Sequence, residues 1–468
     1  MSKLDEVGAW AEERLPALLA EHQVPGAALA VFSGEEMAET AAGVLSKATG
    51  VEATTDSVFQ VGSITKVWTT TLAMQLADEG KLDIEARVRS YLPEFAIADE
   101  DAAAQITVRQ LMCHVSGFEG DIFTDTGKGD DCVEKYVATL RDVPQLFPPG
   151  EMFSYNNAAF CVLGRIIEVL RGKPYDDCLR DHLFGPLQLT HAAASPYEAI
   201  LHRAAVGHIQ PEPDAEWQPA PVWSLVRSNA PAGAVLSMRP RDLLSFVRMH
   251  LAGGRAARDP GAGPGGAVLS TASVQAMQER QVKLPDLGLL ATSWGLGWEI
   301  FDLPTGTLIG HDGGTIGQAA YLRVAPGHDV GVALLTNGGV THPVYHEVVG
   351  RVLRELTGIE LPPAPVPSPQ PPPIDASRYI GTYSSAVAES VVTQDGDGRV
   401  WLERTPKGIA AELGATQEKT ELVAWRGDTL IPVEAEHGMH VPHAFLGDDG
   451  HGHTQYMHTG RADRRQSG

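Results

Sequence analysis

The distribution of apolar positions divides the first three quarters of the chain into strand-like and helix-like runs. Residues 27–32 (AALAVF) form an unbroken apolar run, which is typical of a buried strand. Residues 319–324 and 330–335 are similar runs, and Pro326 and Gly327 between them predict a hairpin turn. Strands are therefore expected near both ends of this region.

Helical spacing occupies much of the sequence between these strands. In residues 63–79, apolar side chains recur every three to four positions, and Gly80 is suited to end the helix. Residues 157–170 (NAAFCVLGRIIEVL) repeat the pattern, and a further helix is expected at 344–356. These elements predict an α+β fold, in which both ends of the region build an antiparallel sheet and a helical insertion lies between them.

A proline-rich segment, residues 361–373 (LPPAPVPSPQPPP), interrupts these patterns. Eight of the twelve residues from 362 to 373 are proline, which fits a stiff polyproline spacer and excludes helix or strand. A recognition peptide for a partner with an aromatic groove is the alternative interpretation. We therefore expect a first domain at residues 1–360 and a second at 374–468.

Short strand-like runs occupy the second domain. Turn sequences such as DGDG at residues 395–398 and GDDG at 447–450 separate them. Regular short strands of this kind predict a small all-β barrel or sandwich. The predicted strands are residues 379–385, 391–393, 400–403, 422–425, 429–433, 444–446 and 454–458.

Charge narrows the range of partners. The 468 residues include 36 Lys and Arg against 59 Asp and Glu, a net charge of −23. Such an acidic surface argues against nucleic acid and against an anionic membrane as partners. The first 23 residues carry Asp5, Glu6, Glu12 and Glu13, which does not fit a secretory signal, and no window reaches the ~18 apolar residues of a membrane helix. A cytoplasmic protein is expected.

The segment VGSITK, residues 61–66, carries the sharpest chemical signal. Ser63 would start a helix, and Lys66 would follow one turn later on the same face. The helix N-terminus favours negative charge on the serine Oγ, and burial can lower the pKa of the lysine until it accepts the serine proton. A hydroxyl activated in this way can attack an acyl carbon. Alone the motif is weak, because an ordinary helix start with an exposed lysine looks the same.

Two further motifs could complete such a site. Tyr155 directly precedes an apolar helix; beside a lysine it could pass a proton to a leaving group, and Asn157 could hold both the lysine and a substrate amide. In residues 310–314 (GHDGG), glycine would let a substrate lie close to a strand edge, and His311 would add a donor or a positive charge. A buried tyrosine and a glycine-rich turn are the ordinary alternatives, and a second H-x-G triplet at 458–460 shows how weak that pattern is alone.

Taken together, S-x-x-K, Y-x-N and H-x-G in this order resemble the motifs of the serine penicillin-binding protein and class C β-lactamase clan. The resemblance implies a β-lactamase/transpeptidase-like fold, an acyl-enzyme on Ser63, and neither a cofactor nor a catalytic metal. It further implies that Lys66 is the base, Tyr155 the proton shuttle, and the main chain of Ser63 with Gly313–Gly314 the oxyanion hole. It spans residues 24–356 and includes stretches typical of the clan at 81–95, 111–118, 149–157 and 294–298.

Departures from that clan narrow the expected function. His311 stands where class C β-lactamases usually carry lysine, which makes an efficient β-lactamase unexpected. The second domain resembles the lipocalin-like barrel attached to some peptidases and peptide cyclases of the clan. A cytosolic member of this kind is most similar to the penicillin-binding-protein-type thioesterases, which release nonribosomal peptides by head-to-tail macrolactam cyclisation. The expected partner is a peptide acyl substrate, a thioester or ester that a carrier protein could deliver.

Other activities stay open at this point. A D-amino-acid peptidase or D-alanyl-D-alanine carboxypeptidase-like hydrolase would use the same acyl-enzyme with water. A carboxylesterase or weak β-lactamase would act on small acyl substrates, and a silent binding protein would use the cleft as a receptor. Histidines in the second domain invite a metal site, but their spacing matches no tetrahedral pattern and surface histidines are expected; they are His437, His440, His443, His451, His453 and His458.

Overall fold

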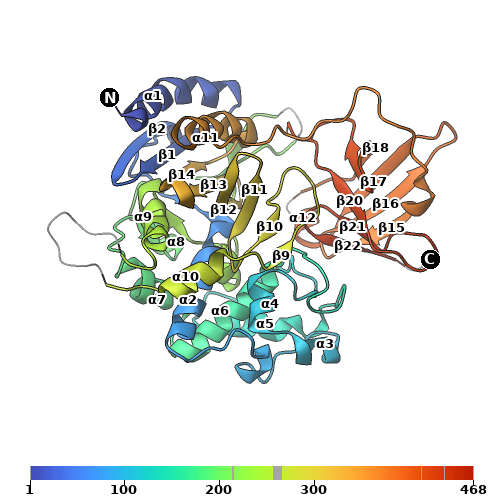
Figure 1. The fold of residues 1–468 in the computed structure, drawn as a ribbon, viewed down its shortest axis with the longest axis horizontal. Helices are drawn as coiled ribbons and strands as arrows, with labels where there is room; N and C mark the ends of the chain where they lie inside the picture. Colours follow the sequence, from blue (N-terminus) through green and yellow to red (C-terminus); the bar gives the residue numbers. More distant parts are fainter. Residues whose placement is uncertain (1, 213–214, 257–265, 413, 437, 467–468) are drawn as a thin grey trace.

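The structure is a computed structural model, and it describes residues 2–212, 215–256, 266–412, 414–436 and 438–466. A part built from a sheet and helices is joined to a β-barrel (Figure 1). The sheet of the first part is antiparallel, and its strands lie in the order β3 (Val51–Glu52), β2 (Glu36–Ser46), β1 (Gly26–Ser33), β14 (Val330–Thr336), β13 (Gln318–Ala325), β12 (Gly306–Thr315), β11 (Glu299–Leu303), β10 (Ser293–Trp294) and β9 (Val282–Lys283).

The centre of this sheet joins the two ends of the first part of the chain. β1 pairs with β14, so that Ala28 lies opposite Leu335, and its other edge pairs with β2. Nearly all of β1 and all of β14 are buried, which explains their unbroken apolar sequences. The strands expected at residues 27–32, 319–324 and 330–335 are confirmed, and so is the α+β fold class.

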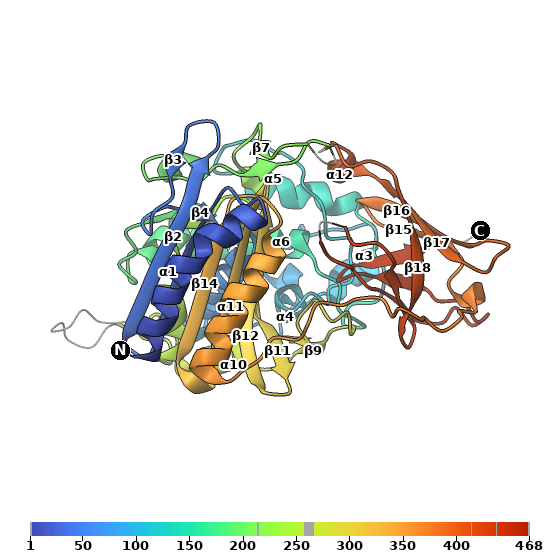
Figure 2. The ribbon, with the colours of Figure 1, turned by 90° about the horizontal axis from the view of Figure 1, so that it is seen from above.

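Helices cover both faces of the sheet. α1 (Lys3–Glu21) and α11 (Thr341–Thr357) lie side by side over one face (Figure 2). They bury side chains such as Leu15 and Val349 against that face, whereas Phe246 of α9 (Pro240–Leu251) packs against the other. The sheet is thus the middle layer of three.

The helical insertion is organised around two buried helices. α2 (Thr65–Asp78) is buried along almost its whole length, and α6 (Asn157–Arg171) packs beside it. Asn156 caps the start of α6 by accepting from the Ala159 N–H at 2.7 Å, and Gly172 ends the helix in the left-handed conformation. The other α-helices of the described residues are α3 (Glu100–Gln105), α4 (Val108–Met112), α5 (Cys132–Thr139), α7 (Tyr175–Leu179), α8 (Pro196–Ala199) and α10 (Thr271–Gln278), together with α12 (Gly408–Glu412) in the C-terminal part.

The C-terminal part is a closed antiparallel barrel of eight strands. The all-β class of this part was predicted from the sequence. β22 closes it by pairing with β15. This last strand was not predicted, because its sequence, ADRR, contains no apolar run. The strands are β15 (Gly381–Ser384), β16 (Ala388–Gln394), β17 (Val400–Pro406), β18 (Glu418–Arg426), β19 (Thr429–Pro432), β20 (His443–Leu446), β21 (Tyr456–His458) and β22 (Ala462–Arg465).

Residues 361–373, all of which the structure describes, contain no helix or strand and run from α11 to the barrel (Figure 2). Within the described ranges, no helix has both the length and the apolar character needed to cross a membrane. Two small sheets complete the first part: β4 (Phe59–Gln60), β8 (Ser237–Met238) and β5 (Ala192–Ala193) form one, and β6 (His208–Ile209) and β7 (Gln218–Pro219) form the other.

Candidate active site

Ser63 and Lys66 lie where a 3-10 turn, Gly62–Ile64, leads into helix α2. Lys66 is fully buried, and its Nζ lies 3.0 Å from the Oγ of Ser63. The same Nζ lies 2.7 Å from Asn157 Oδ1 and 2.6 Å from the carbonyl oxygen of Ala232. The predicted pairing of serine and lysine along one helix face is therefore present.

The surroundings of Lys66 favour a neutral amine. Burial, assisted by the nearby charge of Arg461, lowers the pKa of Lys66 from 10.5 to about 7. A neutral amine has two N–H bonds and one lone pair. Asn157 Oδ1 and the Ala232 carbonyl oxygen can each accept a hydrogen bond from one of the two N–H groups. The lone pair is then left to accept the proton of the Ser63 hydroxyl. Lys66 can therefore act as the general base.

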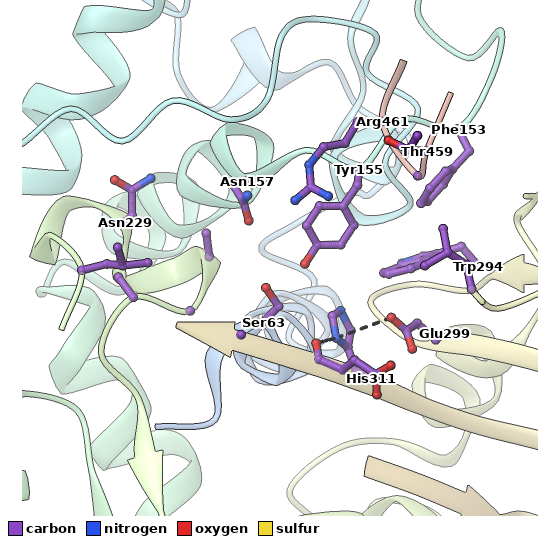
Figure 3. Close-up of a pocket in the computed structure, with 18 of the residues that line it drawn as sticks. Ser63, Phe153, Tyr155, Asn157, Asn229, Trp294, Glu299, His311, Thr459 and Arg461 are labelled. Atoms are coloured by element: carbon purple, nitrogen blue, oxygen red, sulfur yellow. Dashed lines mark hydrogen bonds and ion pairs between the residues drawn. The ribbon is translucent and has the colours of Figure 1, made fainter. Parts of the chain in front are cut away.

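Tyr155 lies on the other side of the serine, with its hydroxyl directed toward it (Figure 3) and hydrogen-bonded to Ser63. Its ring stacks on His114 at 4.3 Å between centroids and lies 4.8 Å from Lys66 Nζ. Desolvation raises the pKa of Tyr155 well above its ordinary value of 10. The phenol therefore keeps its proton at neutral pH and can donate it.

Asn157 is the first residue of α6 and holds Lys66 from that side. Its Nδ2 donates to Asp121 Oδ1 at 2.7 Å. The sequence suggested that this amide would also bind a substrate amide. In the structure one N–H of Nδ2 is taken by Asp121, so Asn157 links Lys66 to a carboxylate, and its second N–H leaves the predicted contact with a substrate amide open.

Three backbone segments meet beside Ser63 without side chains between them. A Cβ on Gly62 would lie 2.6 Å from the nitrogen of Gly314, and a Cβ on Gly313 would lie 2.0 Å from the Val61 carbonyl. A Cβ on Gly233, at φ +118°, would lie 2.3 Å from the Gly62 carbonyl. Glycine is therefore required where strand β12 reaches the serine turn. The main chain of β12 can supply an oxyanion-hole donor there.

His311 of β12 is buried at the floor of the cavity, and its Nδ1 donates to the Asp312 carbonyl oxygen at 2.6 Å. Burial lowers the pKa of His311 to about 3. This shift favours a neutral ring over the positive charge that was one of the two roles suggested by the sequence. Glu299, a residue that the motifs did not reveal, has a carboxylate oxygen 3.9 Å from Nδ1, and burial raises its pKa.

The barrel contributes directly to the site. Arg461 pairs with Asp121 and lies 4.8 Å from the ring of Tyr155, and the carbonyl of Gly460 accepts from the Tyr155 N–H at 3.0 Å. These contacts were not foreseen. The available signal was weak: Gly460 ends the second H-x-G triplet.

A cavity of about 310 Å³ lies over Ser63. Its walls come from the helical insertion, from the sheet and from the barrel (Figure 3). Phe123 adds to the walls from the segment between α4 and α5, and Leu225 and Asn229 add to them from the segment after β7.

Surface positions were expected for the histidines of the barrel, but two of them are buried. His443 and His458 are buried, and Nε2 of His458 lies 2.9 Å from the carbonyl oxygen of Phe153 in the first part of the chain. His458 therefore joins the barrel to the segment that carries Tyr155. His437 lies outside the described residues.

An α+β fold with this serine, lysine and tyrosine around one cavity defines the class of a serine hydrolase. The family model named Beta-lactamase matches residues 11–354, so the chain belongs to that family, within the clan of serine penicillin-binding proteins and class C β-lactamases. Membership of the clan that the sequence predicted is confirmed.

Similar proteins cover both parts of the chain. Penicillin-binding protein 4 of Amycolatopsis lactamdurans is 44% identical over 375 residues, 80% of this chain and 96% of that protein. The crystal structure of SurE is 28% identical with a TM-score of 0.78, and it covers 99% of both chains. The crystal structure of SurE with D-Leu is 29% identical with a TM-score of 0.75 and the same coverage.

Proposed function

We propose that this protein is a penicillin-binding-protein-type thioesterase that releases a nonribosomal peptide by head-to-tail macrolactam cyclisation. The observation that carries the proposal is the contact between the buried Lys66 amine and Ser63 Oγ at the base of a cavity. A serine with a neutral lysine as its base forms ester intermediates with acyl donors.

In the acylation step, Lys66 takes the Ser63 proton while Oγ attacks the thioester carbon. The amides of Ser63 and Gly314 stabilise the oxyanion. The carbon–sulfur bond then breaks, and the protonated pair of Lys66 and Tyr155 returns the proton to the departing thiol. Atoms balance, and the product is the peptide ester of Ser63.

In the release step, the peptide's own terminal amine attacks that ester. Tyr155 and Lys66 accept a proton from the amine, and the bond between the acyl carbon and Oγ breaks as the proton returns to Ser63. The result is a cyclic peptide and free enzyme. Water in place of the amine gives a linear acid, so hydrolysis and cyclisation differ only in the second nucleophile.

The charge of the site favours a thioester over a substrate with a terminal carboxylate. Burial lowers the pKa of His311, which favours a neutral ring, and Arg461 is already paired with Asp121. A carboxypeptidase substrate or a β-lactam carries a carboxylate that needs a cation, whereas the leaving group of a thioester does not. This supports a thioesterase rather than a carboxypeptidase.

A D-configured residue at the acylated end is part of the proposal. The similar structure of SurE was determined with D-Leu, and the likeness extends over the barrel as well as the first part of the chain. The same observation favours a second candidate, a D-amino-acid peptidase that hydrolyses the acyl-enzyme.

A pair of linear peptide thioesters tests the proposal. Both end in the same D-residue; one has a free amino terminus and the other is N-acetylated. We expect mass spectrometry to find a cyclic product, 18 Da lighter than the linear acid, from the first peptide and only linear acid from the second. Linear acid from both supports the peptidase instead. Rapid turnover of p-nitrophenyl esters with no reaction of either peptide contradicts both.

A further inference from the structure

A second cavity of about 640 Å³ lies between the first part of the chain and the barrel. The loop between β9 and β10 forms one wall, and the start of α11 and the first residues of the linker form another. The barrel adds Met439 and Val441. We call this cavity the interdomain chamber. Its volume falls within the roughly 300–1,000 Å³ of pockets that enclose ligands.

The chamber adjoins the catalytic cavity. Leu290, Asp312 and Thr459 line both. Leu290 is 39% exposed, and Gly460 leaves room for its side chain, because a Cβ there would lie 2.9 Å from it. An acyl chain on Ser63 that extends past Leu290 would therefore lie at the chamber.

The lining is mainly apolar, and its charges are largely paired within the described part of the chain. Arg323 makes two hydrogen bonds with Asp312, at 2.6 and 3.0 Å, and lies over the ring of Phe301 at 4.3 Å. Arg426 of the barrel pairs with Asp286 across the two parts of the chain at 3.4 Å. Asp302 pairs with Arg280, Lys283 is exposed, and burial lowers the pKa of His342. The chamber therefore suits a neutral, apolar occupant.

We propose that the interdomain chamber binds apolar side chains of the peptide acyl group, beyond the residue that is joined to Ser63. The inference rests on the proposed function and narrows its substrate class to peptides with apolar residues near the acylated end. Leu289 and Leu290 of the β9–β10 loop provide the contact surface, whereas Leu284 and Leu287 of the lining are buried. Burial of one leucine-sized side chain in such a surface changes binding about tenfold or more.

Two peptide thioesters of equal length and with the same C-terminal D-residue test this inference. One carries leucine and valine at the positions next to that residue, and the other carries serine and glutamine. We expect the intact enzyme to consume the apolar thioester with a kcat/KM at least tenfold higher. Leu289 lines the chamber but not the catalytic cavity. The variant Leu289→Asp should therefore bring the ratio of the two kcat/KM values close to one.

Two further variants control the measurement. Met439→Glu changes the chamber from the barrel side and should also lower the ratio, so the test does not depend on the folding of one variant. Leu201→Asp alters an 81% exposed leucine outside both cavities and should keep the ratio of the unaltered enzyme.

Three outcomes overturn the inference. A ratio near one in the unaltered enzyme, or an unchanged ratio in both Leu289→Asp and Met439→Glu, shows that apolar side chains bind elsewhere. Faster consumption of a long-chain fatty acyl thioester than of the apolar peptide shows that a lipid occupies the chamber. Consumption of neither peptide, with p-nitrophenyl esters still hydrolysed, overturns the proposed function and this inference with it.

Discussion

At the scale of single residues, the chemistry depends on what surrounds one amine. Lys66 Nζ has three oxygen neighbours and no adjacent carboxylate, so burial dominates its pKa. Asp121 and Arg461 lie one step further out and act on Lys66 through Asn157 and through their charges. The barrel thereby influences a base that lies on the core helix of the first part.

The first prediction concerns the pH dependence of acylation. Because the pKa of Lys66 lies near 7, kcat/KM for an ester should rise as the pH increases through about 7 and then level off. Lys66→Arg keeps the charge but cannot give up its proton, so kcat/KM should fall by about 10³ on the plateau above pH 7, and the rising limb should be lost. Initial rates from pH 5.5 to 9 measure both. A rate that falls with rising pH across this range would contradict Lys66 as the base.

The second prediction uses the ion pair between Arg461 and Asp121. The Arg461 charge lowers the pKa of Lys66, and the Asp121 charge raises it. Arg461→Gln should therefore shift the rising limb of the kcat/KM profile to higher pH, and Asp121→Asn should shift it to lower pH. A purely structural role would lower the rate without moving the limb. If both substitutions shifted the rising limb in the same direction, the electrostatic explanation would be refuted.

At the scale of elements, the site forms where strand β12 meets the 3-10 turn before α2. The residues from 310 to 314 were predicted from sequence as a glycine-rich strand edge, because glycine runs have a local signal. Gly233 was not predicted. It follows the 3-10 turn Arg227–Ala232, which has no periodic pattern, and its contact with Gly62 joins positions far apart in the chain.

The third prediction tests that contact. Gly233→Ala adds a Cβ 2.9 Å from the Ser63 nitrogen at a φ of +118°, so it should displace the oxyanion-hole donor. We expect kcat/KM to fall by about 10²–10³. Gly172→Ala is the matched control, because it has a positive φ with no neighbour within 4 Å. It should destabilise the fold by about 1–2 kcal/mol in a denaturant titration and leave kcat/KM unchanged. Equal activity in both variants would contradict the close approach.

At the scale of the whole molecule, the chain is two structures that share one active site. Strands β1, β13 and β14, the two buried helices and the barrel type were predictable because periodicity and turn residues are local signals. Ser63 and Lys66 were predictable for the same reason, since three residues separate them on one helix. The role of the barrel was not, because Arg461 and Gly460 reach Tyr155 across some 300 residues of chain, and no local pattern encodes such a contact.

The central claim is that Ser63 carries the peptide as an ester. The most direct test is the intact mass of the enzyme, acid-quenched within seconds of mixing with a peptide thioester that ends in a D-residue. We predict an added mass equal to the peptide acyl group, located on Ser63 by fragmentation and absent from Ser63→Ala. An adduct on another residue, or product formation by Ser63→Ala at the rate of the unaltered enzyme, would contradict the account.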